Sequence, residues 1–387
     1  MSLPRRFLVV GAGFSGAVMA RQLAENCACH VTVMEERSHV AGNCHTERDE
    51  STGVMVHRYG PHIFNTNRRD VWDFVNTFAE FGAYINRVKA INRHGVFPLP
   101  VNLQTINQFF GKTMGPKEAE KFVEDLGDKT IGEPRNFEEQ ALKFVGRQLY
   151  EAFFYGYSKK QWGCEPSALP ASILKRLPVR FNYDDNYYDA TYQGIPLQGY
   201  TAIVEAILDH KSLDIILNAP FSPADTANFD HVFYTGPIDA FFEYRHGRLG
   251  YRTVTFDRGV STGDYQGNAV INYGELDVPF TRVHEHKHFA PWEQHEKTVY
   301  FREFSKETEP GDTPYYPKRL KHDKELLAIY RKAAKTMEKT SFLGRLGTYR
   351  YLNMDQVIGE TLDFAKVAQQ AIFSNTKVPV FSNQEPA

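Results

Sequence analysis

A chain of 387 residues with 42% hydrophobic side chains is long enough to form two or three domains with sizeable cores. Its formal net charge of −2 excludes a general basic surface that would recruit nucleic acid or an anionic membrane, so an anionic ligand must be held by local arginines. The apolar run after Arg5 and Arg6 meets glycine too early to be a signal peptide or a membrane span, and we expect a cytoplasmic protein.

The first predicted element is a strand that runs into a glycine-rich turn and then a helix. The apolar residues 7–10 precede the sequence GAGFSG at residues 11–16, and a helical pattern continues through Ala24. The first glycine of such a turn allows the tight bend, the second lets the backbone approach a pyrophosphate, and the third lets the helix pack on the strand. We therefore expect a dinucleotide at this helix N-terminus, bound by Gly11, Gly13, Phe14, Ser15 and Gly16.

A second strand, residues 31–34, ends in the acidic residue Glu35. An acid at this position accepts hydrogen bonds from the hydroxyls of an adenosine ribose. A second glycine-containing turn, Ala41-Gly42-Asn43, follows shortly afterwards. Flavoproteins of this fold often carry such an extension and nicotinamide dehydrogenases usually do not, so the pattern favours FAD over NAD.

The later segments alternate between strand and helix patterns. Residues 54–64 predict a strand that runs into the turn Gly60-Pro61, and residues 101–160 predict helices with Asn136 as an N-cap. The pattern then predicts a strand that rejoins the nucleotide-binding sheet at 231–236, short strands over 251–302, and helices at 321–339 and after Met354.

These elements predict an α/β fold with a discontinuous, Rossmann-like FAD-binding domain. We assign to that domain residues 1–85, 199–245 and 321–387. An inserted helical substrate domain takes residues 103–182. A twisted antiparallel sheet domain takes one strand from 86–102, a segment shared with the active site from 183–198, and the whole of 246–320.

Metal and disulfide chemistry are not predicted. The four cysteines, Cys27, Cys29, Cys44 and Cys164, do not form paired CxxC units. Residues 284–288, HEHKH, match the zinc-protease pattern HExxH, which requires both histidines on one face of a helix. The flanking segments indicate strand or loop instead, and we expect no metal site.

The middle of the chain combines aromatic rings with basic side chains. Residues 153–163, FFYGYSKKQWG, are followed by KRLPVR at 175–180 and NYDDNYY at 182–188. Aromatic rings stack on nucleobases and guanidinium groups bind phosphate oxygens, so this composition suits a nucleoside diphosphate. An aromatic helical core beside a solvated basic loop would explain the composition equally well.

Six segments, in this order, resemble the bacterial UDP-galactopyranose mutases: GAGFSGA, YGPHIF, YGYSKKQWG, KRLPVRFNYDDNYY, TGPIDAFF and GRLGTYRYLNMD. The resemblance covers nearly the whole chain. It implies an FAD domain, a helical domain and a twisted β-sheet domain. It also implies an isomerase in which the N5 atom of reduced FAD attacks the anomeric carbon of UDP-galactopyranose, and UDP-galactofuranose forms without net oxidation.

The resemblance further implies a set of site residues. Arg176 and Arg282 would grip the diphosphate, and His62 would lie beside the flavin as a third catalytic residue. The substrate would contact Asn86, Phe153, Tyr157, Ser158, Trp162, Tyr187, Asn272, Tyr316 and Tyr351. Besides the glycine turn, the flavin would contact Glu35, Asn43, His62, Ile63, Arg345 and Met354, where a helix would point its positive end at the cofactor.

The chain departs from the family pattern at three positions, where Asn65 replaces a histidine, Asn353 an aspartate and Ala41 a glycine. The first two leave the sugar open, with UDP-N-acetylgalactosamine or a 6-deoxy sugar nucleotide as alternatives. Two other functions also remain open: an FAD-dependent oxidoreductase of the amine-oxidase type, and a sugar-nucleotide binding protein without turnover. Family members are often homodimers, and we expect a homodimer here.

Overall fold

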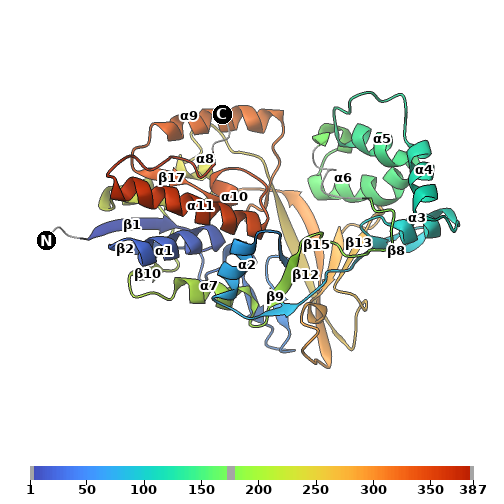
Figure 1. The fold of residues 1–387 in the computed structure, drawn as a ribbon, viewed down its shortest axis with the longest axis horizontal. Helices are drawn as coiled ribbons and strands as arrows, with labels where there is room; N and C mark the ends of the chain where they lie inside the picture. The colour runs from blue at the N-terminus through green and yellow to red at the C-terminus, as the bar shows by residue number, and fades with distance from the viewer. Residues whose placement is uncertain (1–3, 172–178, 384–387) are drawn as a thin grey trace.

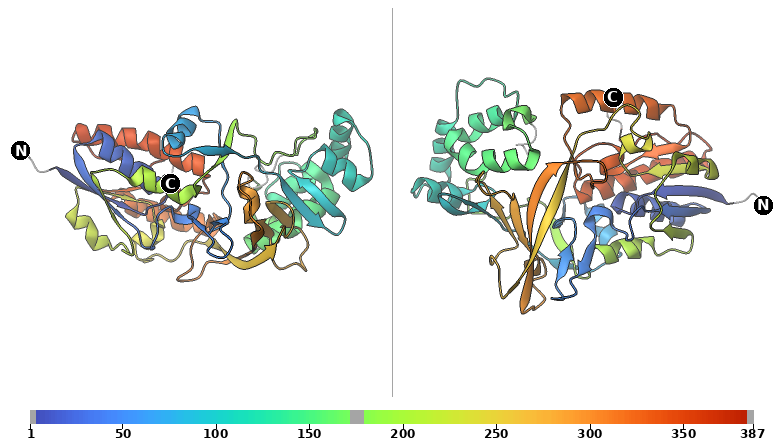
Figure 2. Two further views of the ribbon diagram at one scale, coloured as in Figure 1. Left: turned by 90° about the horizontal axis from the view of Figure 1, so that it is seen from below. Right: turned by 180° about the vertical axis from the view of Figure 1, so that it is seen from behind.

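The computed structural model describes residues 4–171 and 179–383, which form three parts (Figure 1). A parallel sheet with helices on both faces contains the two ends of the described chain. A seven-stranded sheet lies in the middle, and a group of helices lies on its far side. Two further views show the same separation of the helical group from the parallel sheet (Figure 2).

The parallel sheet has the strand order β10-β2-β1-β11-β17, and every pair in it is parallel. Its strands are β1 (Arg5–Val10), β2 (Cys29–Met34), β10 (Leu213–Ile216), β11 (His231–Tyr234) and β17 (Thr340–Phe342). The predicted strand at 231–236 therefore rejoins the nucleotide-binding sheet, directly beside β1.

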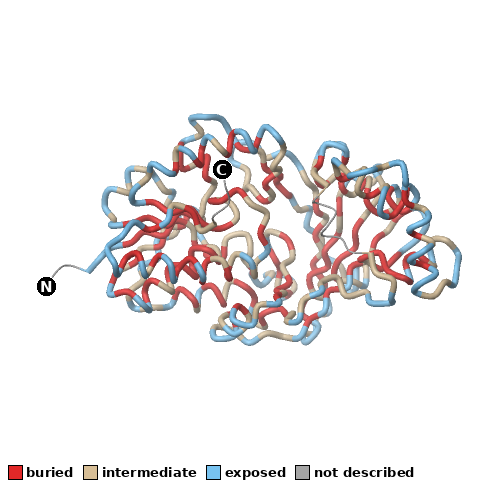
Figure 3. Tube along the Cα trace, turned by 45° about the horizontal axis from the view of Figure 1, so that its top comes forward, coloured by how far each residue is buried: buried red, intermediate tan, exposed pale blue. Residues whose placement is uncertain are grey.

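Helices cover both faces of this sheet, so β1, β2, β11 and β17 are mostly buried, whereas the edge strand β10 is exposed (Figure 3). Because side chains of a strand alternate, Phe7 and Val9 of β1 pack into one core with α1, α7 and α11, whereas Leu8 and Val10 pack into a second core with α8 and α9. The bounds of these helices are α1 (Phe14–Asn26), α7 (Gly199–Leu208), α8 (Ile238–Phe241), α9 (Lys321–Lys335) and α11 (Met354–Phe373).

The seven-stranded sheet has the order β16-β12-β15-β14-β13-β7-β8, and only its β13–β7 pair is parallel within the described residues. Its strands are β7 (Val88–Asn92), β8 (Gly95–Leu99), β12 (Tyr251–Thr262), β13 (Val270–Tyr273), β14 (Arg282–Glu285), β15 (Lys297–Glu307) and β16 (Tyr316–Pro317).

Two expectations for this sheet were wrong in detail. The region 86–102 supplies two strands rather than one, because Arg93 and His94 form a turn between β7 and β8. The region 251–302 does not contain only short strands, because β12 and β15 pair along almost their whole length, from Arg252 opposite Glu307 to Thr262 opposite Lys297.

The helical group contains α3 (Leu103–Phe110), α4 (Pro116–Leu126), α5 (Phe137–Leu149), a π-helical stretch (Tyr150–Tyr155) and α6 (Gly156–Trp162). Asn136 is the N-cap of α5, as predicted, since its Oδ1 accepts a hydrogen bond from the Glu139 N–H at 2.9 Å. The helix is not regular throughout, because Gly146 has a φ of +74° and lies against the carbonyl of Leu126.

Shorter elements join these parts. They are the pair β3 (Thr46–Arg48) and β4 (Met55–His57), the sheet of β5 (Phe64–Thr66), β9 (Tyr192–Pro196) and β6 (Phe81–Ala83), the helices α2 (Arg69–Asn76) and α10 (Gly344–Gly347), and 3-10 turns at Gly42–Cys44, Pro166–Ala168, Pro223–Asn228 and His286–Phe289.

The segment 54–64 contains a strand, β4, that runs into the predicted turn, and β5 begins at its last residue. The segment 183–198 differs from expectation, because it contributes β9 to the small sheet rather than to the large one. The proposed domain boundaries themselves stay a prediction. Among the described residues, no helix combines the length and the apolar character needed to cross a bilayer.

Candidate active site

The glycine-rich turn forms a cradle that only glycine allows. Gly11 has a φ of +98°, and a Cβ there would lie 2.2 Å from Oγ1 of Thr235 on the segment after β11. A Cβ at Gly16 would lie 1.8 Å from the Gly11 carbonyl oxygen, so the helix packs directly on the turn. Gly13 is the N-cap of α1, whose first turn contains Phe14 and Ser15. The free N–H groups of this turn suit a pyrophosphate.

Glu35 ties this cradle to the end of β2. Its side chain is buried, with Oε2 accepting from the Ala12 N–H at 2.8 Å and Oε1 accepting from the Arg37 N–H at 3.0 Å. Each carboxylate oxygen keeps a second lone pair, which suits the hydroxyls of a ribose. Asn43 lies in the next turn, where its Oδ1 accepts from Arg37 Nη2 at 2.9 Å.

The backbone of Ala41 has a conformation that favours glycine. Its φ of +73° lies in the left-handed region, which costs an L-residue roughly 1 kcal/mol. The next residue, Gly42, packs against Gly13, since a Cβ at Gly42 would lie 3.3 Å from the Gly13 Cα. The chain therefore keeps the turn on the cradle despite the substitution.

Arg345 follows β17 at the same edge of the parallel sheet as the glycine turn, and it lies beside the cradle. The preceding Gly344 has a φ of +77°, and a Cβ there would lie 2.3 Å from Ser15 Oγ. Arg345 Nε donates to the Leu352 carbonyl at 3.0 Å, and its guanidinium lies 5.0 Å from the ring centroid of Tyr351. Met354 begins α11, as predicted, so a helix N-terminus opens close to this arginine.

The two departures Asn65 and Asn353 have local structural roles. Asn353 is the N-cap of α11, and its N–H donates to Gln356 Oε1 at 2.9 Å. Asn65 lies on β5, where its Nδ2 donates to the carbonyl of Ile63 at 3.1 Å.

His62 lies in the turn between β4 and β5, next to the buried Ile63. Its Nδ1 lies 2.9 Å from the Gly60 carbonyl, so Nδ1 carries the proton and Nε2 is an acceptor. Burial lowers the pKa of His62 to about 4, and the charges of Arg345 and Arg282 act in the same direction. His62 is thus a neutral imidazole on which the charges of two arginines act.

Two further histidines orient this turn. The His62 N–H donates to His57 Nδ1 at 3.2 Å, and the His57 N–H donates to His286 Nδ1 at 3.2 Å. Burial lowers the pKa of His286 to about 3 and that of His57 well below its usual range. The network therefore consists of neutral rings at pH 7.

Arg282 on β14 is a partly buried cation, with 24% of its side chain exposed, and its counter-ion is buried. Its Nε lies 2.9 Å from Oε1 of Glu303 on β15, and the Glu303 side chain is only 1% exposed. Glu303 also accepts from Thr281 Oγ1 at 3.3 Å and lies 3.5 Å from Nε2 of His284. Burial opposes the charge of Arg282, but Glu303 keeps its pKa well above the usual value.

Tyrosines from separate segments surround this cation. The rings of Tyr316 and Tyr351 stack with centroids 5.4 Å apart. Burial raises the pKa values of Tyr157, Tyr187 and Tyr316, and in each case the charge of Arg282 acts in the opposite direction, which places all three phenols within its electrostatic reach. Neutral hydroxyl groups around a guanidinium suit the oxygens of a diphosphate.

A cavity of about 40 Å³ adjoins Tyr157 and Tyr187 and is also lined by Phe153 and Asn272. Within the described residues, the buried Oδ1 atoms of Asn272 and Asn86 have no hydrogen-bond partner. The Asn86 carbonyl accepts from the Tyr187 N–H at 2.9 Å, so both amides lie at this site. A bound water or a ligand would satisfy these buried amide oxygens.

The remaining predicted residues are not all brought together. Ser158 and Trp162 lie on α6 but do not line the cavity. Arg176 lies outside the described residues.

Glu303 was not among the predicted site residues. The sequence did hold a signal for it: Val299, Phe301 and Glu303 share one face of β15, and an acid on a buried face needs a partner.

The HEHKH segment does not form the helix that a zinc protease requires. Residues 282–285 form β14 and residues 286–289 a 3-10 turn. Ligand atoms of Asp264, Glu285 and His288 do lie within 4.8 Å of one another. The carboxylates of this cluster already have partners within the chain, because Lys287 pairs with Asp264 and three backbone N–H groups donate to Glu285.

The fold and these contacts define an α/β protein with a Rossmann-type glycine cradle and, apart from it, a cationic, tyrosine-rich site around Arg282. A family model for UDP-galactopyranose mutase matches residues 152–351, and a model for an NAD(P)-binding Rossmann-like domain matches residues 9–78. The chain belongs to the UDP-galactopyranose mutase family. The sequence resemblance and the predicted fold class are thereby confirmed.

Several relatives match over nearly the full length. The chain is 52% identical to a probable UDP-galactopyranose mutase of Klebsiella pneumoniae, over 98% of both chains. It is 48% identical to a dTDP-fucopyranose mutase of Escherichia coli, over 94% of this chain and 98% of that one. A UDP-galactopyranose mutase of Mycoplasma pneumoniae is 31% identical over 92% of this chain and 94% of that one.

A crystal structure of reduced UDP-galactopyranose mutase aligns with a TM-score of 0.75 at 16% identity, over 97% of this chain and 95% of that one, and shows the shared fold. Putrescine oxidase also shares the fold, with a TM-score of 0.56 at 11% identity over 94% of this chain and 98% of that one. This likeness explains why the sequence alone leaves an amine-oxidase type open. Family membership indicates a sugar-nucleotide mutase, hence an isomerase.

Proposed function

We propose that this protein interconverts UDP-galactopyranose and UDP-galactofuranose, with FAD as its cofactor. The observation that carries the proposal is the position of Arg282. It is a partly buried cation whose charge acts on the phenols of Tyr157 and Tyr316 and also on His62, and the charge of Arg345 acts on His62 as well. A diphosphate bound at Arg282 would therefore lie next to the cofactor.

The residues of the cradle fit FAD. Glu35 would bind the ribose, the turn from Gly11 to Gly16 the pyrophosphate, and Arg345, His62, Ile63 and the N-terminus of α11 at Met354 would contact the ring system. When bound and reduced, FAD supplies a nucleophilic N5 atom for the anomeric carbon, so the isomerisation needs no net oxidation.

The protein itself would retain the leaving group. Arg282 would bind the diphosphate, with Arg176 as a second cation, and the hydroxyls of Tyr187, Tyr316 and Tyr351 would add directed hydrogen bonds. Glu303 would keep Arg282 charged and oriented when no substrate is present. The Nε2 atom of the neutral His62 would accept a hydrogen bond from the cofactor or the sugar. Retention matters because the diphosphate must reattach after the sugar ring changes.

A dTDP-linked 6-deoxy sugar is the second candidate substrate. The relative named dTDP-fucopyranose mutase is 48% identical to this chain, close to the 52% of the probable UDP-galactopyranose mutase. Both substrates carry a pyrimidine nucleoside diphosphate, and they differ in the base, the ribose and the sugar O6. UDP-N-acetylgalactosamine remains a further candidate, whereas a binding protein without turnover predicts affinity alone.

The test is a direct comparison of substrates. FAD-loaded protein is incubated anaerobically with UDP-galactofuranose or dTDP-fucofuranose, with and without dithionite, and the pyranose product is quantified by chromatography. We expect conversion only after reduction and a higher kcat/KM for the UDP sugar. A higher value for the dTDP sugar would establish the second candidate, and turnover that consumes the reduced flavin would establish an oxidoreductase. The homodimer and the cytoplasmic location remain predictions.

A further inference from the structure

The ammonium group of Lys160 makes hydrogen bonds that have no role in the proposed reaction. Its Nζ lies 2.8–2.9 Å from four backbone carbonyl oxygens, those of Tyr273, Glu275, Val278 and Phe280. An ammonium group has three N–H donors, and here they are shared among four acceptors. All four carbonyls belong to residues 273–280, the end of β13 and the connection to β14. We call residues 273–281 the β13–β14 hairpin loop.

Two site residues flank the hairpin loop directly, one on each side. Asn272 on β13 and Arg282 on β14 stand directly opposite each other in the strand register. The loop is closed by a hydrogen bond from the Tyr273 N–H to the Thr281 carbonyl at 2.9 Å. Any movement of the loop therefore moves the amide that lines the nucleotide cavity and the guanidinium proposed to bind the diphosphate.

Helix α6 touches the same loop at a second point. A Cβ on Gly156 would lie 2.0 Å from the carbonyl oxygen of Gly274, so the backbone of the helix lies directly against the loop. Gly156 and Lys160 are four residues apart and hence on one face of the helix. Tyr157 lies between them in sequence and lines the nucleotide cavity.

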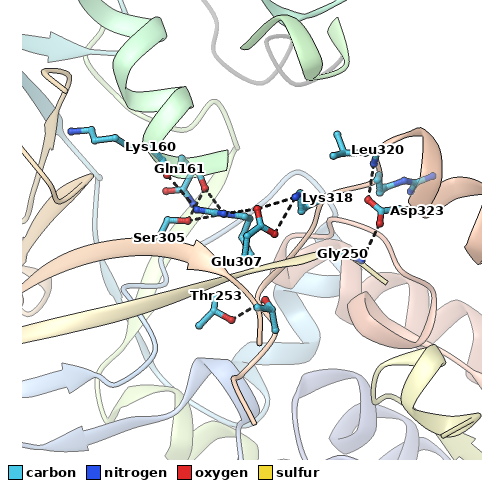
Figure 4. Close-up of polar contacts among 12 residues, drawn as sticks. Lys160, Gln161, Gly250, Thr253, Ser305, Glu307, Lys318, Leu320 and Asp323 are labelled. Atoms are coloured by element: carbon cyan, nitrogen blue, oxygen red, sulfur yellow. Dashed lines mark hydrogen bonds and ion pairs between the residues drawn. The ribbon is translucent and has the colours of Figure 1, made fainter. Parts of the chain in front are cut away.

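The C-terminal end of α6 is held separately. The carbonyl of Gln161 accepts from Arg252 Nε at 3.1 Å and from Ser305 Oγ at 2.7 Å. Figure 4 shows the Lys160 side chain extending away from Gln161 and Ser305, so it contacts a different surface. The Lys160 hydrogen bonds thus connect the helix to the hairpin loop beside the backbone contact at Gly156.

We propose that Lys160 is a positioning residue for nucleotide binding. It fixes the position of α6 relative to the β13–β14 hairpin loop, so that Tyr157, Asn272 and Arg282 face the same nucleoside diphosphate. The inference rests on the proposed function, since it assumes that a nucleotide occupies this cavity. An uncharged side chain leaves the carbonyl oxygens without donors, and the loop then moves away from the helix to reach water.

The test compares Lys160→Met with Lys159→Met in FAD-loaded protein. Lys159 is a matched control on the same helix, because its Nζ pairs with the exposed Glu165 rather than with the hairpin loop. Dissociation constants for UDP and dTDP are measured by calorimetry on the oxidised protein, and KM and kcat on the reduced protein. We expect Lys160→Met to raise the nucleotide Kd and the KM at least tenfold, with a smaller change in kcat and unchanged FAD content. Lys159→Met should match the wild type.

A Lys160→Met protein that is folded and FAD-loaded, and binds the nucleotide within twofold of wild type, overturns the proposal. So does a loss of kcat at an unchanged KM. If that variant does not fold, Gly156→Ala tests the same contact from the other side and should raise the Kd, whereas a wild-type Kd would overturn the proposal. If the wild-type protein binds neither UDP nor dTDP, the proposed function fails, and this inference fails with it.

Discussion

Replacing Glu303 with glutamine should make the protein less stable but more responsive to its ligand. The change keeps the size of the side chain and removes the charge that lies 2.9 Å from Arg282. At an effective dielectric constant of about 20, the attraction at that distance is about 6 kcal/mol. Removing one partner of a fully buried pair typically costs 3–5 kcal/mol, and the 24% exposure of the Arg282 side chain reduces the expected cost to about 2–3 kcal/mol. We expect Glu303→Gln to lower the free energy of unfolding by about that amount.

A diphosphate supplies the missing negative charge, so it should restore much of the lost stability. The assay is thermal unfolding of FAD-loaded protein with and without UDP, since a ligand that binds only the folded state raises the melting temperature. The shift caused by UDP should be larger in Glu303→Gln than in wild type. Asp257→Asn serves as the control, because Asp257 pairs with Arg302 at the surface and such pairs contribute about 1 kcal/mol or less.

A UDP-induced shift in Glu303→Gln that equals or falls below the wild-type shift would refute this reasoning. It would mean that Glu303 does not compete with the ligand for Arg282, and that the diphosphate is bound elsewhere.

Three other changes test separate parts of the site. Arg282→Ala should reduce turnover at least about a hundredfold while the flavin absorbance of the purified protein stays unchanged, and retained activity would contradict the diphosphate assignment. Gly11→Ala should instead lose the cofactor, because the new Cβ would lie 2.2 Å from Thr235 Oγ1, and the ratio of flavin to protein absorbance would show this. His62 and His286 are neutral when folded, with pKa values lowered to about 4 and about 3, but take up protons near pH 6.5 when unfolded. Stability should therefore fall as the pH drops through 6.5, by about 2 kcal/mol per histidine between pH 7 and pH 5 in urea titrations, and equal stability at both pH values would argue against buried neutral rings.

The sequence by itself determined the features that depend on a few neighbouring residues. The glycine turn is one example, because Gly16 packs on the carbonyl of Gly11 within one strand, turn and helix. The N-cap at Asn136 and the start of α11 at Met354 are others, since capping is a local hydrogen-bonding requirement. The family resemblance added the ordered set of site residues, which no single motif would have assigned.

Tertiary structure decided which of these residues meet. Arg282, Glu303, Tyr157 and Tyr316 lie on four separate elements, and only the packing of α6 against the seven-stranded sheet brings them together. No local pattern records such a meeting, because three of these elements are strands whose hydrogen-bonding partners lie elsewhere in the chain. The kink at Gly146 and the placement of β9 were likewise set by distant partners.

The two adjacent lysines of α6 show the distinction most simply. Lys159 and Lys160 are identical in chemistry and neighbours in sequence, yet one pairs with Glu165 near the surface and the other binds four carbonyls of the hairpin loop. Successive residues of a helix point in directions about 100° apart. The sequence shows that rotation, but only the folded chain shows which side of the helix meets the loop, because the loop lies far along the chain and its position depends on the whole sheet.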